Sequence, residues 1–154
     1  MGPRWREMYE RVLRMHGDAF DSAIGEDAAG DRAYAFFIFC FHLKDWIKND
    51  TSIDAGVRAA VEAFVSATPA LALAADIANG VKHLVRDRSV RVDDSVRLSA
   101  GGDRLGMNFS LGTSVLGFVL VIAGDHGHRP ARSVADECVK AWTTFLTTHR
   151  LLTL

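Results

Sequence analysis

The chain has 154 residues, of which 49% are hydrophobic and 24% are charged. This composition is typical of one globular domain and excludes a disordered or fibrous chain. The formal net charge of −1 provides no overall attraction to nucleic acid, so any such binding would require a local patch. Cys40 and Cys138 match no zinc or redox spacing. We predict buried free thiols in a reducing compartment.

The N-terminal segment "MGPRWREMYERVLRM" alternates charged with apolar residues. A signal peptide or a transmembrane helix requires an uninterrupted apolar stretch, so we expect a cytoplasmic protein that has no membrane partner. In residues 4 to 24, apolar side chains recur at steps of three and four. This spacing predicts a surface helix with one buried stripe.

The next predicted helix runs from about Asp31 to Lys48. Its segment Phe36 to Phe41 has no polar face, which indicates the central and most buried helix of a bundle. The helix then becomes polar, and helical spacing places His42 and Asp45 on one face as neighbours.

Two further helices are predicted before residue 88. Asp54 is a plausible N-cap for the third helix, and Thr68 followed by Pro69 predicts a cap and a first-turn proline for the fourth, "PALALAADIANGVKHLVRD". Gly80 costs roughly 1 kcal/mol relative to alanine inside a helix, which suits close approach of a ligand or a second backbone. One face of the fourth helix carries polar side chains, with Lys82 one step around: Asp76, Asn79, His83 and Arg86. The second and fourth helices therefore predict one shared polar groove.

After Arg88 the pattern changes to that of strands. The runs "SVRLSA", "RLGMNF" and "SVLGFVLVIAG", the first two separated by "GGD", predict a three-stranded antiparallel sheet over residues 95–124. "GDHGHRP" is interpreted as a loop, and Ser133 as the start of a helix over 133–150 that packs through Trp142 and Phe145. The predicted fold class is α+β, mostly α. It comprises one domain over 1–154, with an antiparallel four-helix bundle in 1–88 followed by the sheet and the C-terminal helix.

The segments "FCFHLKDWIKND" and "ADIANGVKHL", a short sheet and an "ADECVKAW" helix together resemble a group of uncharacterised bacterial proteins that look like members of the HEPN superfamily. The resemblance covers most of the chain. It implies a helical bundle, often dimeric, and in many members a metal-independent endoribonuclease of toxin, abortive-infection or CRISPR-associated systems.

The HEPN signature has an arginine, a polar residue and then a histidine on one helix. By this resemblance His83 matches the histidine and Asn79 the polar residue, whereas Ala78 stands at the arginine position. In the family's chemistry the arginine would hold the phosphate and the histidine would transfer a proton. Lys82 or Arg86 would have to supply the missing cation from a neighbouring turn.

The polar residues of the second and fourth helices also have purely structural interpretations. His42 and Asp45 could form a hydrogen-bonded pair favoured by the helix dipole, and "NDTS" could simply end that helix. Asp76, Asn79 and His83 could form a network that fixes helix packing.

Three functional hypotheses follow. The first in rank is a HEPN-like binding or regulatory module that keeps the groove for a nucleotide, an RNA or a protein partner, without a cofactor. The second is a metal-independent endoribonuclease whose motif is incomplete. The candidate catalytic residues are His83, Asn79 and Lys82, and the candidate binding residues are His42, Asp45, Asp76 and Arg86.

The third hypothesis is a metal site, for zinc or manganese, at His42, Asp45, Asp76 and His83. The resemblance also makes a homodimer a candidate assembly. We further predict that replacing His83 by alanine impairs function more than it impairs stability.

Overall fold

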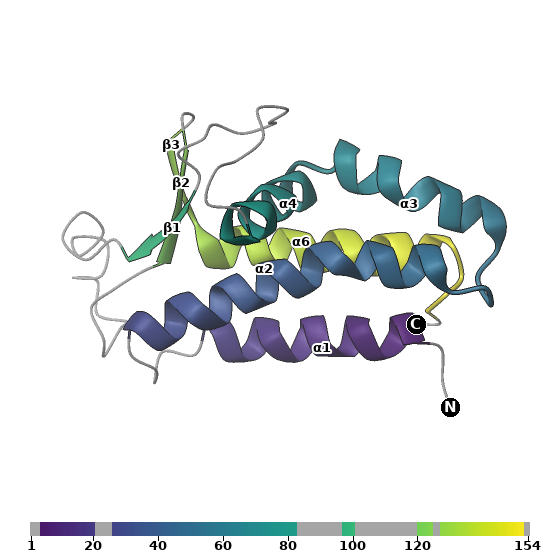
Figure 1. Cartoon of the computed structure of the whole chain (residues 1–154), viewed down its shortest axis with the longest axis horizontal. Coiled ribbons are helices and arrows are strands. Elements are labelled where there is room, and N and C mark those ends of the chain that lie inside the picture. The colour runs from purple at the N-terminus through teal and green to yellow at the C-terminus, as the bar shows by residue number, and fades with distance from the viewer. Residues whose placement is uncertain (1–3, 21–25, 83–96, 101–119, 125–126, 153–154) are drawn as a thin grey trace.

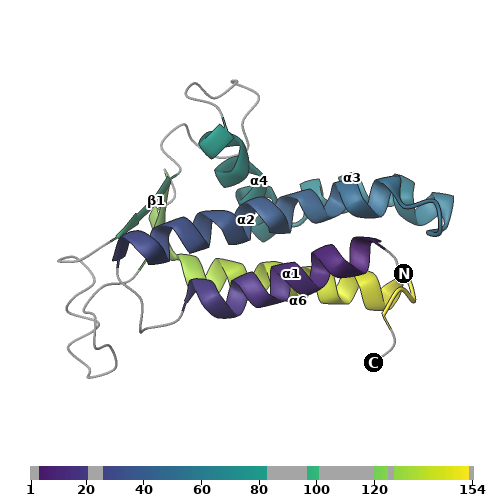
Figure 2. The same ribbon diagram turned by 60° about the horizontal axis from the view of Figure 1, so that its bottom comes forward.

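A computed structural model describes residues 4–20, 26–82, 97–100, 120–124 and 127–152. The chain is mostly helical, as the sequence predicts. Its described helices are α1 (Arg4–Ala19), α2 (Glu26–Asn49), α3 (Ala55–Ala67), α4 (Pro69–Lys82) and α6 (Ala131–Thr148). In Figure 1, α2 runs along the molecule with α1 beside it, and α3 and α4 cover its other side. Figure 2 shows α1 and α6 together below α2.

Helix α2 is the centre of this arrangement, because it contacts α1, α3, α4 and α6. Its inner face is fully buried and recurs at helical spacing: Phe36, Phe37, Cys40, Leu43 and Ile47. The prediction of a central, most buried second helix is confirmed. The helix begins five residues earlier than predicted, at Glu26 instead of Asp31.

The C-terminal helix α6 belongs to the same core. Trp142 is fully buried, its indole nitrogen donates to the Cys40 carbonyl of α2 at 3.1 Å, and its ring meets Phe64 and Phe145 edge-on. Packing through Trp142 and Phe145 is therefore confirmed. The start of the helix was predicted wrongly: α6 begins at Ala131 after Pro130, which makes no side-chain cap, so Ser133 lies inside the helix.

The helices α3 and α4 do not form an antiparallel pair, because their axes meet at 87°. Asp54 caps α3 as predicted, accepting from the backbone N–H of Gly56 at 2.8 Å. Pro69 stands at the first position of α4, also as predicted. Thr68, however, donates its hydroxyl back to the Phe64 carbonyl at 2.8 Å, so it closes α3 and does not cap α4 with its side chain. Because of this corner, the four helices described within residues 4–82 do not form the predicted antiparallel four-helix bundle.

Residues 70–78 of α4 are all buried. The helix is rich in alanine, and small side chains allow α2, α3 and α6 to approach it closely. Asp76 is buried among them with 8% of its surface exposed. The predicted polar face of the fourth helix is therefore not a solvent-facing surface at this position.

Three short strands are described: β1 (Arg97–Ala100), β2 (Leu120–Gly124) and β3 (Gly127–Pro130). They pair antiparallel in the order β1-β2-β3, with Leu98 opposite Ile122 and Ile122 opposite Arg129. The sheet predicted over 95–124 is thus matched only in part. Strand β3 was predicted as a loop, and the predicted strand 104–109 lies outside the described residues.

The two thiols are free and buried, as predicted. Cys138 donates to the Ala70 carbonyl at 3.3 Å, which joins α6 to α4. A hydrogen bond with Cys40, together with burial, raises the pKa of the Cys138 thiol well above its ordinary value. A thiol held in its protonated form is chemically unreactive, so Cys138 serves as core packing. Cys40 is also fully buried in the core.

Asp50 holds the turn that follows α2. Its carboxylate accepts from the backbone and hydroxyl of Ser52 at 2.9 and 2.6 Å, which holds the turn after α2. The same hydrogen bonds, with contributions from the backbone N–H groups of Trp5 and Arg4, lower the pKa of Asp50. The polar segment after α2 therefore ends that helix and holds the turn that leads to α3.

Within the described residues, no single helix combines the length and hydropathy that crossing a membrane requires. α3 and α4 up to Asn79 pass that test only as a pair with the 87° bend between them.

Candidate functional site

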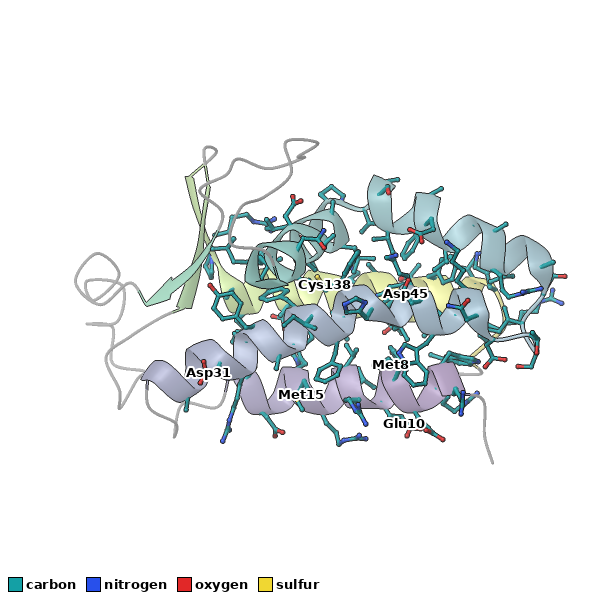
Figure 3. The ribbon with its side chains drawn as sticks, in the orientation of Figure 1. Met8, Glu10, Met15, Asp31, Asp45 and Cys138 are labelled. Carbon is teal, nitrogen blue, oxygen red and sulfur yellow. The ribbon has the colours of Figure 1, made fainter. Side chains whose placement is uncertain are left out.

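His42 and Asp45 form the polar pair that the sequence predicts on one face of α2. The His42 Nδ1 atom lies 2.9 Å from Asp45 Oδ2, and the two side chains are 42% and 41% exposed. Helical spacing of three residues makes this contact possible within a single turn. Figure 3 shows Asp45 in the half of α2 that runs alongside α3, far from Asp31 at the other end of that helix.

The pair continues into a network that crosses from α2 to α3. Lys44 Nζ lies 3.1 Å from Asp45 Oδ1 and 3.0 Å from Glu62 Oε1 on α3. Lys48 Nζ donates to the same Glu62 oxygen at 3.1 Å. Only 12% of the Lys44 side chain is exposed, and its ammonium also lies 4.8 Å from the centre of the Phe41 ring. We call these five residues the α2–α3 polar cluster: His42, Lys44, Asp45, Lys48 and Glu62.

The charges of the cluster stabilise one another. Burial acts to raise the pKa of Asp45, but hydrogen bonds from His42 and Lys44 outweigh it, so the pKa lies below its ordinary value. The hydrogen bond from Lys44 lowers the pKa of Glu62 as well. Burial acts to lower the pKa of Lys44, yet hydrogen bonds to Glu62 and Asp45 raise it overall. All three groups are therefore ionised at neutral pH.

Ionised Asp45 determines the tautomer of His42. A carboxylate without a proton only accepts hydrogen bonds, so the shared hydrogen belongs to His42 Nδ1. In the neutral imidazole, Nε2 then carries a lone pair, and in the protonated imidazole it becomes a second donor. Among the described side chains no hydrogen-bond partner is recorded for Nε2. His42 thus has an oriented imidazole, 42% exposed, whose Nε2 can accept or donate a proton.

The other predicted site residues do not join this cluster. Asn79 is exposed on α4 and makes no hydrogen bond to His42 or Asp45. Lys82 is the last residue of α4, and its side chain is not described. His83 and Arg86 lie outside the described residues, so their predicted roles are untested.

The predicted groove between the second and fourth helices is addressed only in part, because His83 and Arg86 lie outside the described residues. α2 does lie against α4, as expected. However, the polar side chains of α2 reach Glu62 of α3 and not Asn79 of α4. The 87° corner between α3 and α4 explains the difference, because it leaves α3 alongside the polar end of α2.

The metal hypothesis receives no support from the part of the chain that the structure describes. There, no group of three or more histidine, cysteine, aspartate or glutamate side chains is placed to hold a metal ion. His42, Asp45 and Asp76, three of the four predicted ligands, therefore do not converge.

Sequence reasoning missed Lys44, Lys48 and Glu62 as members of the cluster. The signal that was available is their spacing: Lys44 and Lys48 are four residues apart, which places both ammonium groups on one flank of α2. Their shared partner on α3 follows from packing and not from any local pattern.

A second histidine–aspartate pair in the molecule serves a different purpose. His16 Nε2 of α1 lies 2.6 Å from Asp136 Oδ1 of α6, and the His16 ring packs against Phe20 and Phe36. This pair joins two helices that are far apart in the sequence. It therefore provides a structural counterpart against which His42 can be compared.

Comparisons with protein-family models, with curated proteins and with solved structures found no match to this chain.

Proposed function

We propose that the chain is a HEPN-like binding or regulatory module that takes a phosphate-bearing ligand, a nucleotide or an RNA, at the exposed side of the α2–α3 polar cluster. The proposal agrees with the mostly helical chain and with the resemblance of its two central segments. A protein partner at the same surface is the alternative occupant.

The observation that carries the proposal is the state of His42. Its ring is held by ionised Asp45 through Nδ1, is 42% exposed, and has Nε2 without a partner among the described residues. A histidine that served only to pack the bundle would be buried or would join two helices, as His16 does. His42 does neither, because its partner lies on its own helix. An exposed and oriented imidazole is suited to ligand contact.

The charge of the cluster favours an anion when His42 is protonated. With His42 neutral, two lysines balance two carboxylates, and protonation of His42 adds one positive charge. A phosphate oxygen would accept from protonated Nε2 in a charge-assisted hydrogen bond. Neutral His42 would instead accept from a hydroxyl or amino group, such as those of ribose or a base.

The experiment compares His42→Ala with His16→Ala. Purified variants are titrated with a fluorescein-labelled single-stranded RNA by anisotropy, and with nucleoside mono- and triphosphates by calorimetry. We expect His42→Ala to weaken binding by about tenfold or more, the equivalent of one charge-assisted hydrogen bond. His16→Ala removes a contact between α1 and α6 and should leave ligand affinity unchanged. If the wild-type protein binds none of these ligands, or if His42→Ala binds as well as wild type, the proposal is wrong.

Catalysis of RNA cleavage is the second candidate, and one observation favours it. A carboxylate that holds Nδ1–H and leaves Nε2 available is an arrangement suited to proton transfer. The resemblance assigns that task to His83 instead. Cleavage of single-stranded RNA in the presence of EDTA, tested with His42→Ala and His83→Ala, separates the two residues. Cleavage lost only in His83→Ala would support the resemblance, and absence of cleavage by wild type would exclude this candidate.

A further inference from the structure

We infer that Glu62 of α3 is a positioning residue for His42, acting through Lys44 and Asp45, so that α3 sets the protonation of the proposed ligand-binding histidine. The inference rests on the proposed function for its biological meaning. The physical coupling itself can be measured without any ligand.

An unbroken series of short contacts connects His42 to Glu62. From His42 the contacts are 2.9 Å to Asp45, 3.1 Å from Asp45 to Lys44, and 3.0 Å from Lys44 to Glu62. The two oxygens of Asp45 are divided between partners: Oδ2 faces His42 and Oδ1 faces Lys44. Whatever changes the Lys44 contact therefore changes the carboxylate that holds His42.

The Lys44 side chain is restricted by its surroundings, so it transmits a change at Glu62 to Asp45. Its side chain is mostly buried over the Phe41 ring, and an ammonium removed from water requires compensating partners. Among the described residues those partners are the carboxylates of Asp45 and Glu62. If Glu62 is neutralised, Lys44 must interact more strongly with Asp45. The negative charge available to stabilise protonated His42 then falls.

The charged groups in the series of contacts that begins at His42 come from two helices. On α2 they are Asp45 and Lys44, with Lys48 beyond them, and on α3 the group is Glu62. Glu62 is therefore the contribution of another helix to the electrostatics of the site.

The coupling between Glu62 and His42 should affect the affinity for a phosphate-bearing ligand. A phosphate-bearing ligand prefers protonated His42, so its affinity should rise as the pH falls through the titration midpoint of the imidazole. Linkage requires the reciprocal effect, in which bound ligand moves that midpoint upward. A movement of α3 that separates Glu62 from Lys44 would then weaken binding without touching the ligand.

The test follows the imidazole protons of His42 by NMR across a pH titration of the full chain. Glu62→Gln should move the His42 midpoint to lower pH, and Lys44→Met should move it to higher pH. The two shifts should be opposite in sign, because one variant removes a negative charge and the other removes a positive charge near the imidazole. Glu62→Asp, which keeps the charge, should restore the wild-type midpoint at least in part.

A matched control is Glu137→Gln. Glu137 is a partly exposed carboxylate paired with Arg129 at 2.6 Å, but it lies on α6, outside the cluster. Its replacement should leave the His42 midpoint where it is. Thermal melts of every variant report separately on folding, because loss of a structural ion pair alone would lower the melting temperature without moving the midpoint in opposite directions.

Binding assays complete the experiment. In Glu62→Gln, the pH at which phosphate-ligand affinity is half-maximal should move down together with the His42 midpoint. If the midpoints move as expected but wild type binds no ligand, the coupling stands and the proposed function fails. If Glu62→Gln leaves the midpoint unchanged, or moves it in the same direction as Lys44→Met, Glu62 only joins α3 to α2 and the inference is wrong.

Discussion

Replacing Trp142 by alanine is the sharpest test of the arrangement around α2. Trp142 is fully buried, donates to the Cys40 carbonyl at 3.1 Å, and meets the rings of Phe64 and Phe145 at centroid distances of 5.5 and 6.0 Å. Truncation removes a large apolar side chain from between three helices and leaves a cavity. We expect a loss of about 3 to 5 kcal/mol in the free energy of unfolding.

Two further variants help to interpret this loss of stability. One removes the hydrogen-bond donor, and the other is a matched control. Trp142→Phe keeps an aromatic ring and removes the donor, which leaves the Cys40 carbonyl without this partner and should cost about 1 to 3 kcal/mol. Trp46→Ala is the matched control, because Trp46 lies on the outer side of α2 with 37% of its surface exposed. Its removal should cost about 1 kcal/mol or less.

Urea unfolding followed by far-ultraviolet circular dichroism measures all three variants, since this signal does not depend on tryptophan fluorescence. In thermal melts the Trp142→Ala loss should lower Tm by roughly 6 to 20 °C, from about 2 to 4 °C per kcal/mol for a chain of this size. A Trp142→Ala variant that is no less stable than Trp46→Ala would refute the placement of α6 against α2.

Three other outcomes are expected. Asp50→Ala should destabilise by about 0.5 to 2 kcal/mol in urea unfolding, because it removes the carboxylate that accepts from the backbone N–H and hydroxyl of Ser52 and holds the turn after α2; an unchanged urea midpoint would contradict that role. Ala74→Leu, at a fully buried position of α4, should cost about 1 to 3 kcal/mol by overpacking, whereas Ala63→Leu on the exposed side of α3 should be nearly neutral. Finally, the lowered pKa values of Asp45, Asp50 and Glu62 contribute stability that is present above their ordinary values of 3.8, 3.8 and 4.5 and is lost as the pH falls through the folded values. Urea midpoints measured from about pH 6 to pH 2 should decline in that window, and a decline already complete above pH 5 would point to other groups.

Features that depend on a few consecutive residues were predictable from the sequence. Asp54 caps α3, Pro69 begins α4, and His42 meets Asp45, because each relation spans four residues or fewer along the chain. The buried stripe of α2 was predictable for the same reason, since helical periodicity alone selects the face that packs inward.

Errors arose where local patterns had competing solutions. Thr68 was predicted to cap the helix that follows it, but its hydroxyl bonds back to the helix that precedes it. Ser133 resembled the start of a helix that in fact begins two residues earlier, at Ala131. The segment 127–130 was interpreted as a loop from its glycine and proline, yet pairing with β2 makes it a strand at the edge of the sheet.

The amino-acid sequence by itself determined which residues of α2 form the core and which turn of that helix carries polar side chains, because both follow from the fixed geometry of one helix. Only the tertiary structure decided that this polar turn meets Glu62 of α3 and not Asn79 of α4. The angle between α3 and α4 is set by the simultaneous packing of several helices against α2, and no spacing along the chain encodes it.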